Sequence, residues 1–124
     1  MEESILISTK KILGLDSAYT AFDQDVLTHI NSTFSTLNQL GVGPDDGLFI
    51  TDETAVWSDF ICPANQLHMT KSYMYAKVRL LFDPPATSFA IEALKNQILE
   101  FEVRLNVLRE EFRTEPVEEE DEDV

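Results

Sequence analysis

A regular seam of apolar residues near the C-terminus constrains the fold most strongly. Apolar side chains recur there at alternating steps of three and four, at Ile91, Leu94, Ile98, Phe101, Leu105, Leu108 and Phe112. This spacing places all of them on one side of an α-helix, and it predicts a long helix from Thr87 or Ser88 to Arg113. The seam packs either inside a helical bundle or against a second chain, and the spacing leaves both interpretations open.

Apolar periodicity predicts three further helices, over residues 3–13, 23–40 and 65–82. Glycine or proline follows each of them, and both residue types end helices. The last of the three is apolar over a wide arc, which is typical of a helix central in a bundle or shared with another subunit. The fold class is therefore predicted as all-α, a small bundle of four to five helices with a long C-terminal helix.

Local signals refine this prediction. Asp23 is expected to cap the second helix, with Phe22 and Leu27 forming a hydrophobic staple. Residues 48–51 are expected to form a short extended element, and a short helix is expected after Asp52, which would carry Trp57. Phe34 and Trp57 are expected in the core.

The charge is concentrated at the C-terminus. The 124 residues include 23 acidic and nine basic ones, a net charge of −14, and half of it lies in residues 115–124. A block of like charge with almost nothing to bury favours disorder. We therefore predict a helical domain over residues 1–113 and an acidic disordered tail over residues 114–124. The tail is either a solvated segment or one that meets a basic partner or sets the field of an assembly.

The same composition disfavours several functions. A strongly acidic protein lacks the positive surface that grips nucleic acid or an anionic membrane. No apolar run approaches the roughly 20 residues of a membrane span, and the acidic start of the chain is unlike a secretory signal. The single cysteine, Cys62, forms no internal disulfide, which fits a reducing compartment.

No pattern of chemistry-bearing residues emerges. His29 and His68 have no ligand partner one helical turn away, and Cys62 has no second cysteine nearby. A faint calcium-loop pattern over residues 42–53 fails because Val42 and Pro44 stand where carboxylates are needed. We therefore expect no enzymatic activity, no metal and no cofactor.

Some residues are candidates for contacts between subunits. Arg79 and Asp83 lie four residues apart and form either an ordinary pair within one helix or a bridge between subunits, with Lys77 beside them. Apolar residues away from the main helix faces suggest a second packed surface. They are Ile7, Leu99, Val103 and Val107.

Several phrases of the sequence together resemble one protein family. They are Phe22-Asp23-Gln24-Asp25, His29-Ile30-Asn31-Ser32, the run from Leu37 to Pro44, Trp57-Ser58-Asp59-Phe60, and the run from Tyr75 to Pro85. Over roughly residues 10–110 the chain resembles small proteins from the structural-gene clusters of tailed phages and prophages, similar to the head–tail connector (adaptor) proteins of long-tailed phages. The acidic tail is not part of this pattern.

The resemblance implies a structural role. Copies would assemble in the cytoplasm of the bacterial host into a dodecameric ring under the portal, in the neck of the virion. The ring would extend the DNA channel, pass DNA without binding it specifically, and present a platform to a neck or tail protein. The portal-docking segment would run from about Glu110 to Val124, with Glu110, Glu111, Phe112, Arg113 and Val117 as candidate contacts.

Two other functions stay open. The net charge of −14 suits an acidic DNA mimic that inhibits a host DNA-binding protein, although half of that charge lies in the predicted tail. A tail-completion or tail-terminator protein would belong to the same virion setting as a connector. Neither alternative requires a catalytic residue.

Overall fold

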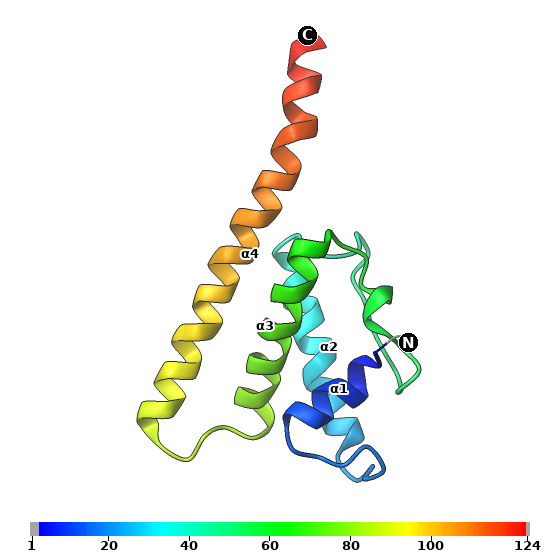
Figure 1. Cartoon of the computed structure of the whole chain (residues 1–124), viewed down its shortest axis with the longest axis vertical. Helices are drawn as coiled ribbons and strands as arrows, with labels where there is room; N and C mark the ends of the chain where they lie inside the picture. The colour runs from blue at the N-terminus through cyan, green and yellow to red at the C-terminus, as the bar shows by residue number, and fades with distance from the viewer. Residues whose placement is uncertain (1–2, 124) are drawn as a thin grey trace.

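The computed structural model describes the backbone of residues 3–123 and the side chains of residues 3–108. Four α-helices follow one another, with one 3-10 turn, η1, before the third (Figure 1). Their bounds are α1 Ile5–Ile12, α2 Asp23–Gln39, η1 Trp57–Asp59, α3 Ala64–Phe82 and α4 Ser88–Asp123. No β-strand forms within residues 3–123. The prediction of an all-α bundle of four to five helices is confirmed.

The third helix is the centre of the bundle. α4 packs along one side of α3, whereas α1 and α2 pack on its other sides. In Figure 1, α4 accordingly lies at one edge of the molecule, and the remaining helices lie beyond α3. The wide apolar arc of residues 65–82 thus has its explanation within one chain, because α3 contacts three other helices.

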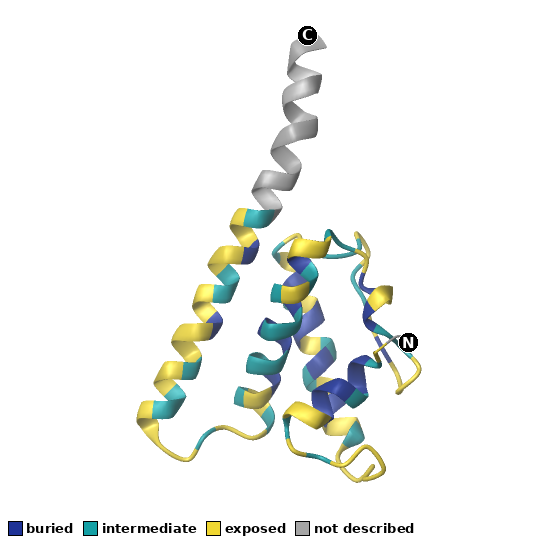
Figure 2. Cartoon of the chain, viewed as in Figure 1, coloured by how far each residue is buried: buried dark blue, intermediate teal, exposed yellow. Residues whose placement is uncertain are grey.

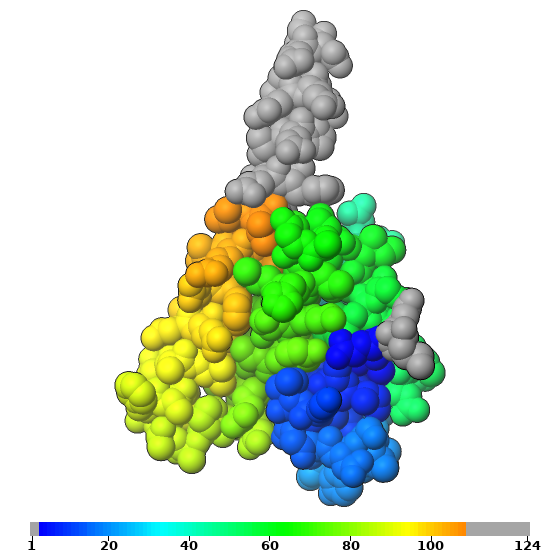
Figure 3. Space-filling view, viewed as in Figure 1, coloured from blue at the N-terminus to red at the C-terminus, as the bar shows by residue number. Residues whose placement is uncertain are grey.

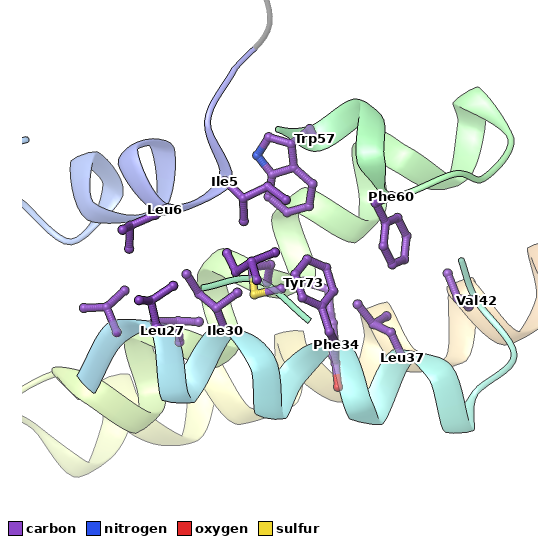
Figure 4. Packing of buried hydrophobic residues seen from close by; sticks show 14 of the residues in the cluster. Ile5, Leu6, Leu27, Ile30, Phe34, Leu37, Val42, Trp57, Phe60 and Tyr73 are labelled. Atoms are coloured by element: carbon purple, nitrogen blue, oxygen red, sulfur yellow. The ribbon is translucent and has the colours of Figure 1, made fainter. Parts of the chain in front are cut away.

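The main core lies between α1, α2, α3 and the segment that follows α2. Phe34 is buried at its middle, with its ring 5.3 Å from that of Phe60 and 6.1 Å from that of Trp57, measured between centroids (Figure 4). The indole N–H of Trp57 donates a hydrogen bond to Ser8 Oγ at 3.0 Å. Both aromatic residues expected in the core are therefore confirmed there.

The apolar seam of α4 packs within the chain. Ile98 and Leu105 are buried, and Leu94 and Phe101 are half-buried against the same core. Figure 2 shows these buried and half-buried positions alternating with exposed ones along α4. Packing within the bundle is thus the correct interpretation for the described part of the seam.

The connection between α2 and α3 is mostly irregular. The helix expected after Asp52 is reduced to η1, because Asp52 accepts hydrogen bonds from Thr54 in a tight turn and so does not cap a helix. Gly43 has a φ of +95°, and a Cβ there would collide with the Phe60 ring. This connection therefore wraps closely over the core.

Residues 48–51 have no regular secondary structure and form no strand. The side-chain amide of Asn31 on α2 donates to Ile50 O and accepts from Ile50 N, each at 2.9 Å. One asparagine thus replaces the neighbouring strand that an extended segment usually needs. The predicted extended element thus forms no strand, and the segment is held to a helix instead.

The predicted cap at Asp23 is wrong. Asp23 is the first residue of α2, and its carboxylate forms an ion pair with Lys10 Nζ at 2.8 Å instead of capping the helix. The ring of Phe22 lies against those of Tyr19 and Phe82, so the expected staple is replaced by an aromatic cluster. The reason is tertiary, since α1 brings a buried lysine to this helix end.

The last helix begins as expected and ends later than its apolar seam predicts. The hydroxyl of Thr87 accepts a hydrogen bond from Ala90 N at 3.1 Å, which caps the start of α4. The helix is assigned to Asp123, beyond the end expected at Arg113. The predicted acidic tail lies outside the described side chains, and its separation from the domain stays a prediction.

Candidate functional site

An exposed apolar patch runs along the side of α4 that faces away from α3. Leu99, Val103 and Val107 follow one another at four-residue steps, and they are 58%, 63% and 49% exposed. We call these three residues the α4 outer patch. Figure 3 shows α4, in yellow to orange, forming one edge of the molecule. Branched apolar side chains lined up on an open helix face are typical of a contact with another molecule.

A polar clasp between α3 and α4 fixes which side of α4 is open. The hydroxyl of Tyr73, a fully buried residue on α3, donates to Glu102 Oε2 at 2.8 Å. Lys77 Nζ lies 4.0 Å from the same oxygen and 5.9 Å from the centroid of the Tyr73 ring. Burial and the neighbouring carboxylate raise the pKa of Tyr73 far above its ordinary value. The clasp orients Glu102 inward and the α4 outer patch outward.

Lys77 is therefore engaged inside the chain. Its amphipathic side chain bridges α3 and α4 at the clasp, where it is half-buried. The sequence placed it among candidate contacts between subunits, beside Arg79 and Asp83 on a helix that is apolar on its other sides. The partner comes from α4, which no local spacing could reveal.

Arg79 and Asp83 meet, but not as an ion pair. Arg79 Nε donates to the backbone oxygen of Asp83 at 3.0 Å, and this contact closes the C-terminal end of α3. Both side chains are exposed. Arg79 also lines a shallow groove of about 310 Å³ between α1, α3 and α4, together with Ile12, Tyr75 and Phe101.

The predicted interface residues do not form one surface. Ile7 is half-buried on α1, Arg79 and Asp83 lie at the end of α3, and the outer patch belongs to α4. Of these three places, the α4 outer patch is the apolar and open one. The predicted portal contacts, Glu110, Glu111, Phe112, Arg113 and Val117, lie outside the described side chains.

A second exposed surface was not predicted from the sequence. A groove of about 640 Å³ runs between the outer side of α2 and residues 49–51. Its floor and walls include Thr28, Asn31, Ser32 and Ser35 from α2, and Phe49 stands beside it, 74% exposed. We call this surface the α2 groove. Alternation could have revealed it, because neighbours in an extended segment point to opposite sides and Ile50 takes the core side.

The charges of the two surfaces differ. Residues 12–70 contain eight acidic side chains and neither lysine nor arginine. Asp46 lines a smaller groove that adjoins the α2 groove at Asn31, Ser35 and Phe49. The exposed Asp25 and Asp52 directly follow Gln24 and Thr51, which line the α2 groove, and hydrogen bonds from Thr54 lower the pKa of Asp52. The exposed charges on the described part of α4 balance, with two of each sign. They are Glu92, Lys95, Glu100 and Arg104.

The described residues offer little for chemistry. No group of three or more metal-binding side chains gathers among them. Cys62 is half-buried, and its burial raises the pKa of the thiol. Within the described helices, none has both the length and the apolar character needed to cross a membrane. The candidate functional site is thus the pair of exposed surfaces described above, the α4 outer patch and the α2 groove.

Comparison with known proteins agrees with a role in assembly. A family model described as "Phage connector protein" matches residues 5–112, which include α1, α2, α3 and the described side chains of α4. No curated protein and no solved structure matches the chain.

Proposed function

The chain belongs to the phage connector protein family, and on that premise we propose that its copies form a ring docked on the portal of a phage capsid. As a member of this family it is a structural connector protein of a phage. In the proposed arrangement the ring lies in the neck of the virion and extends the DNA channel toward the tail. The observation that carries the proposal is the family match over residues 5–112.

The α4 outer patch supports assembly of copies. Leu99, Val103 and Val107 leave an open apolar surface on a chain whose main core is already complete. Repeated copies cover such a surface when each one contacts the next, and a ring results where the rotation closes. We therefore place the contact between subunits at α4, with Arg79 and Asp83 as proposed contributors at the end of α3.

The net charge of −14 supports passage of DNA rather than its capture. A wall of like charge does not grip a polyanion that moves past it. We propose that the segment from Glu110 to Val124 docks on the portal, as the resemblance implies. Assembly in the host cytoplasm, a dodecameric ring and contact with a neck or tail protein belong to the same proposal.

Electron microscopy of the full chain mixed with its portal tests this function. We expect rings seated on the portal, and light scattering should report the gain in mass. A monomer seen without the portal is compatible with the proposal, since the portal can template the ring. Failure to form or join a ring under any condition, with portal that is itself assembled, would overturn it.

Deletion of residues 115–124 separates the connector from the DNA mimic. A mimic that depends on the charge of that segment should lose its target. A connector should dock more weakly on the portal but keep the contacts between the helices of neighbouring copies. The position of the protein in the particle separates a connector from a tail terminator. Labelled protein should lie at the vertex of capsids that have not yet joined a tail, and label on free tails instead of on those capsids would contradict the proposal.

A further inference from the structure

We propose that neighbouring copies meet head to tail, with the α4 outer patch of one copy packed into the α2 groove of the next. This inference rests on the proposed function, because it names the two surfaces that would close the ring. The occupant of the α2 groove is thus a second copy of the chain. Four arguments from the structure support it.

The two surfaces lie on different helices of the molecule. α4 and α2 both pack on α3, and each of the two surfaces belongs to the side of its helix that faces away from the core. A head-to-tail contact requires two different surfaces on one subunit, and it gives a closed ring where the rotation between neighbours closes. The positions of the outer patch and the groove meet this requirement.

The shapes of the two surfaces are complementary. Thr28, Ser32 and Ser35 are small side chains, so they permit a second helix to lie close to α2. The outer patch offers a ridge of Leu99, Val103 and Val107 at four-residue steps, which is the form that enters a groove beside a helix. Phe49, 74% exposed in the single chain, would be covered by the same contact.

Charge favours this pairing over a groove-to-groove contact. Two α2 grooves facing each other would bring Asp25, Asp46 and Asp52 of both copies together, without a lysine or arginine anywhere in residues 12–70. The α4 face has balanced charge, and Lys95 lies one turn before Leu99. The acidic residues near the α2 groove are therefore better matched by the α4 face, which is neutral and has exposed bases, than by the α2 groove of another copy.

A two-fold contact between outer patches leaves the α2 groove open. Such a dimer would cover Leu99, Val103 and Val107, but Phe49 and the α2 groove would stay exposed in every copy. The head-to-tail contact covers both surfaces at once. It also repeats from copy to copy, whereas a two-fold contact stops at two.

Cross-linking between single-cysteine variants tests the interface. The background is full-length protein with Cys62→Ser, and the variants are Val103→Cys on α4 and Ser32→Cys in the groove. A short bismaleimide is added to an equal mixture of the two, assembled on the portal. We expect a cross-linked dimer in this mixture and a ladder of higher species when one chain carries both cysteines. Ser17→Cys, an exposed serine away from both surfaces, replaces Ser32→Cys in the matched control and should give no product.

The outcomes separate the interface from the function. Rings that form on the portal without a link between positions 103 and 32 would overturn the interface and leave the connector proposal standing. A strong link in Val103→Cys protein alone would show a two-fold contact and would also overturn the interface. Absence of any ring, with wild-type protein and intact portal, would overturn both.

Charge reversal gives a second measurement. Lys95→Glu should raise the protein concentration for half-maximal assembly by about two- to five-fold, in the range expected of one exposed charge at the rim of an interface. Asp46→Lys in the same chain should restore assembly, because each copy then meets the reversed charge of its neighbour. Lys11→Glu on α1 changes the net charge equally and should have little effect. An equal effect of Lys11→Glu, or no restoration by Asp46→Lys, would overturn the proposed charge pairing.

Discussion

Replacement of Lys10 by methionine should destabilise the fold severely. Lys10 is 1% exposed, and its ammonium lies 2.8 Å from Asp23 Oδ1, 3.1 Å from Ser17 O and 2.7 Å from Tyr19 O. These three partners match the three hydrogens of the ammonium. The buried Oδ1 of Asp23 has no other polar partner among the described residues. Methionine preserves the apolar stem and leaves the carboxylate and two carbonyls unpaired.

The expected loss is about 3–5 kcal/mol, the range for removal of one partner from a buried ion pair. Urea unfolding measures it, with the fluorescence of Trp57 as the reporter, because this single tryptophan is 2% exposed in the folded chain. With a slope of about 1–3 kcal/mol per molar for a small domain, the midpoint should fall by roughly 1–5 M. A domain at the low end of the ordinary stability range, about 5 kcal/mol, would then be close to unfolding without denaturant.

The matched control is Lys11→Met, since Lys11 is exposed in the same helix. This variant should change the free energy of unfolding by less than about 0.5 kcal/mol. Lys10→Met with a similarly small effect and an unchanged slope would refute the reasoning. In that case the ammonium would be hydrated, and the contact between α1 and the start of α2 would contribute little.

Three further predictions concern the core, the α3 end and the clasp. Phe34→Ala should cost about 3–5 kcal/mol in urea unfolding if it leaves a cavity between Trp57 and Phe60, and a smaller loss with unchanged structure would place Phe34 outside the core. Arg79→Ala should weaken ring assembly, measured by light scattering, more than it weakens monomer folding; equal effects would assign Arg79 to the helix end alone. Tyr73→Phe should lessen the loss of stability in alkaline urea titrations. The pKa of Tyr73 is raised in the folded chain, so the unfolded chain ionises first, and stability falls as the pH rises above about 10. An identical loss of stability at alkaline pH in wild-type and Tyr73→Phe protein would contradict a phenol that is buried in its neutral form.

The sequence predicted correctly those features that depend on the pattern within a single helix. The seam from Ile91 to Leu108 predicted which side of α4 is packed, within the bundle or against a second chain, and the same periodicity identified Leu99, Val103 and Val107 as residues off that side. A periodic pattern identifies an apolar residue that faces away from its own core, because the position of that residue in the repeat differs from the positions of the seam. The start of α4 was predictable as well, because Thr87 and the prolines before it provide local signals.

Contacts between distant segments could not be predicted in this way. Lys10 and Asp23 look like surface charges in the sequence, and only the packing of α1 across α2 buries them together. Lys77 and Glu102 belong to different helices, so no spacing within one helix could pair them. A charge that a local pattern leaves unpaired is therefore ambiguous between a tertiary and a quaternary partner.

The same distinction explains why one half of the proposed interface was visible in the sequence and the other half was not. The outer patch on α4 is a periodic feature of one helix, whereas the α2 groove exists only because Asn31 holds Ile50 against α2 and so turns Phe49 outward. A groove forms only when the fold brings two segments together. The acidic character of this groove depends on the lack of lysine and arginine in residues 12–70 and on the fold that gathers acidic residues near it. Asn31→Ala should therefore disturb the receiving surface without touching the α4 patch. If the head-to-tail contact is correct, the variant should still pack its outer patch into the groove of a wild-type copy. In mixtures with wild-type protein, the variant should therefore join an assembly but accept no further copy at its own groove.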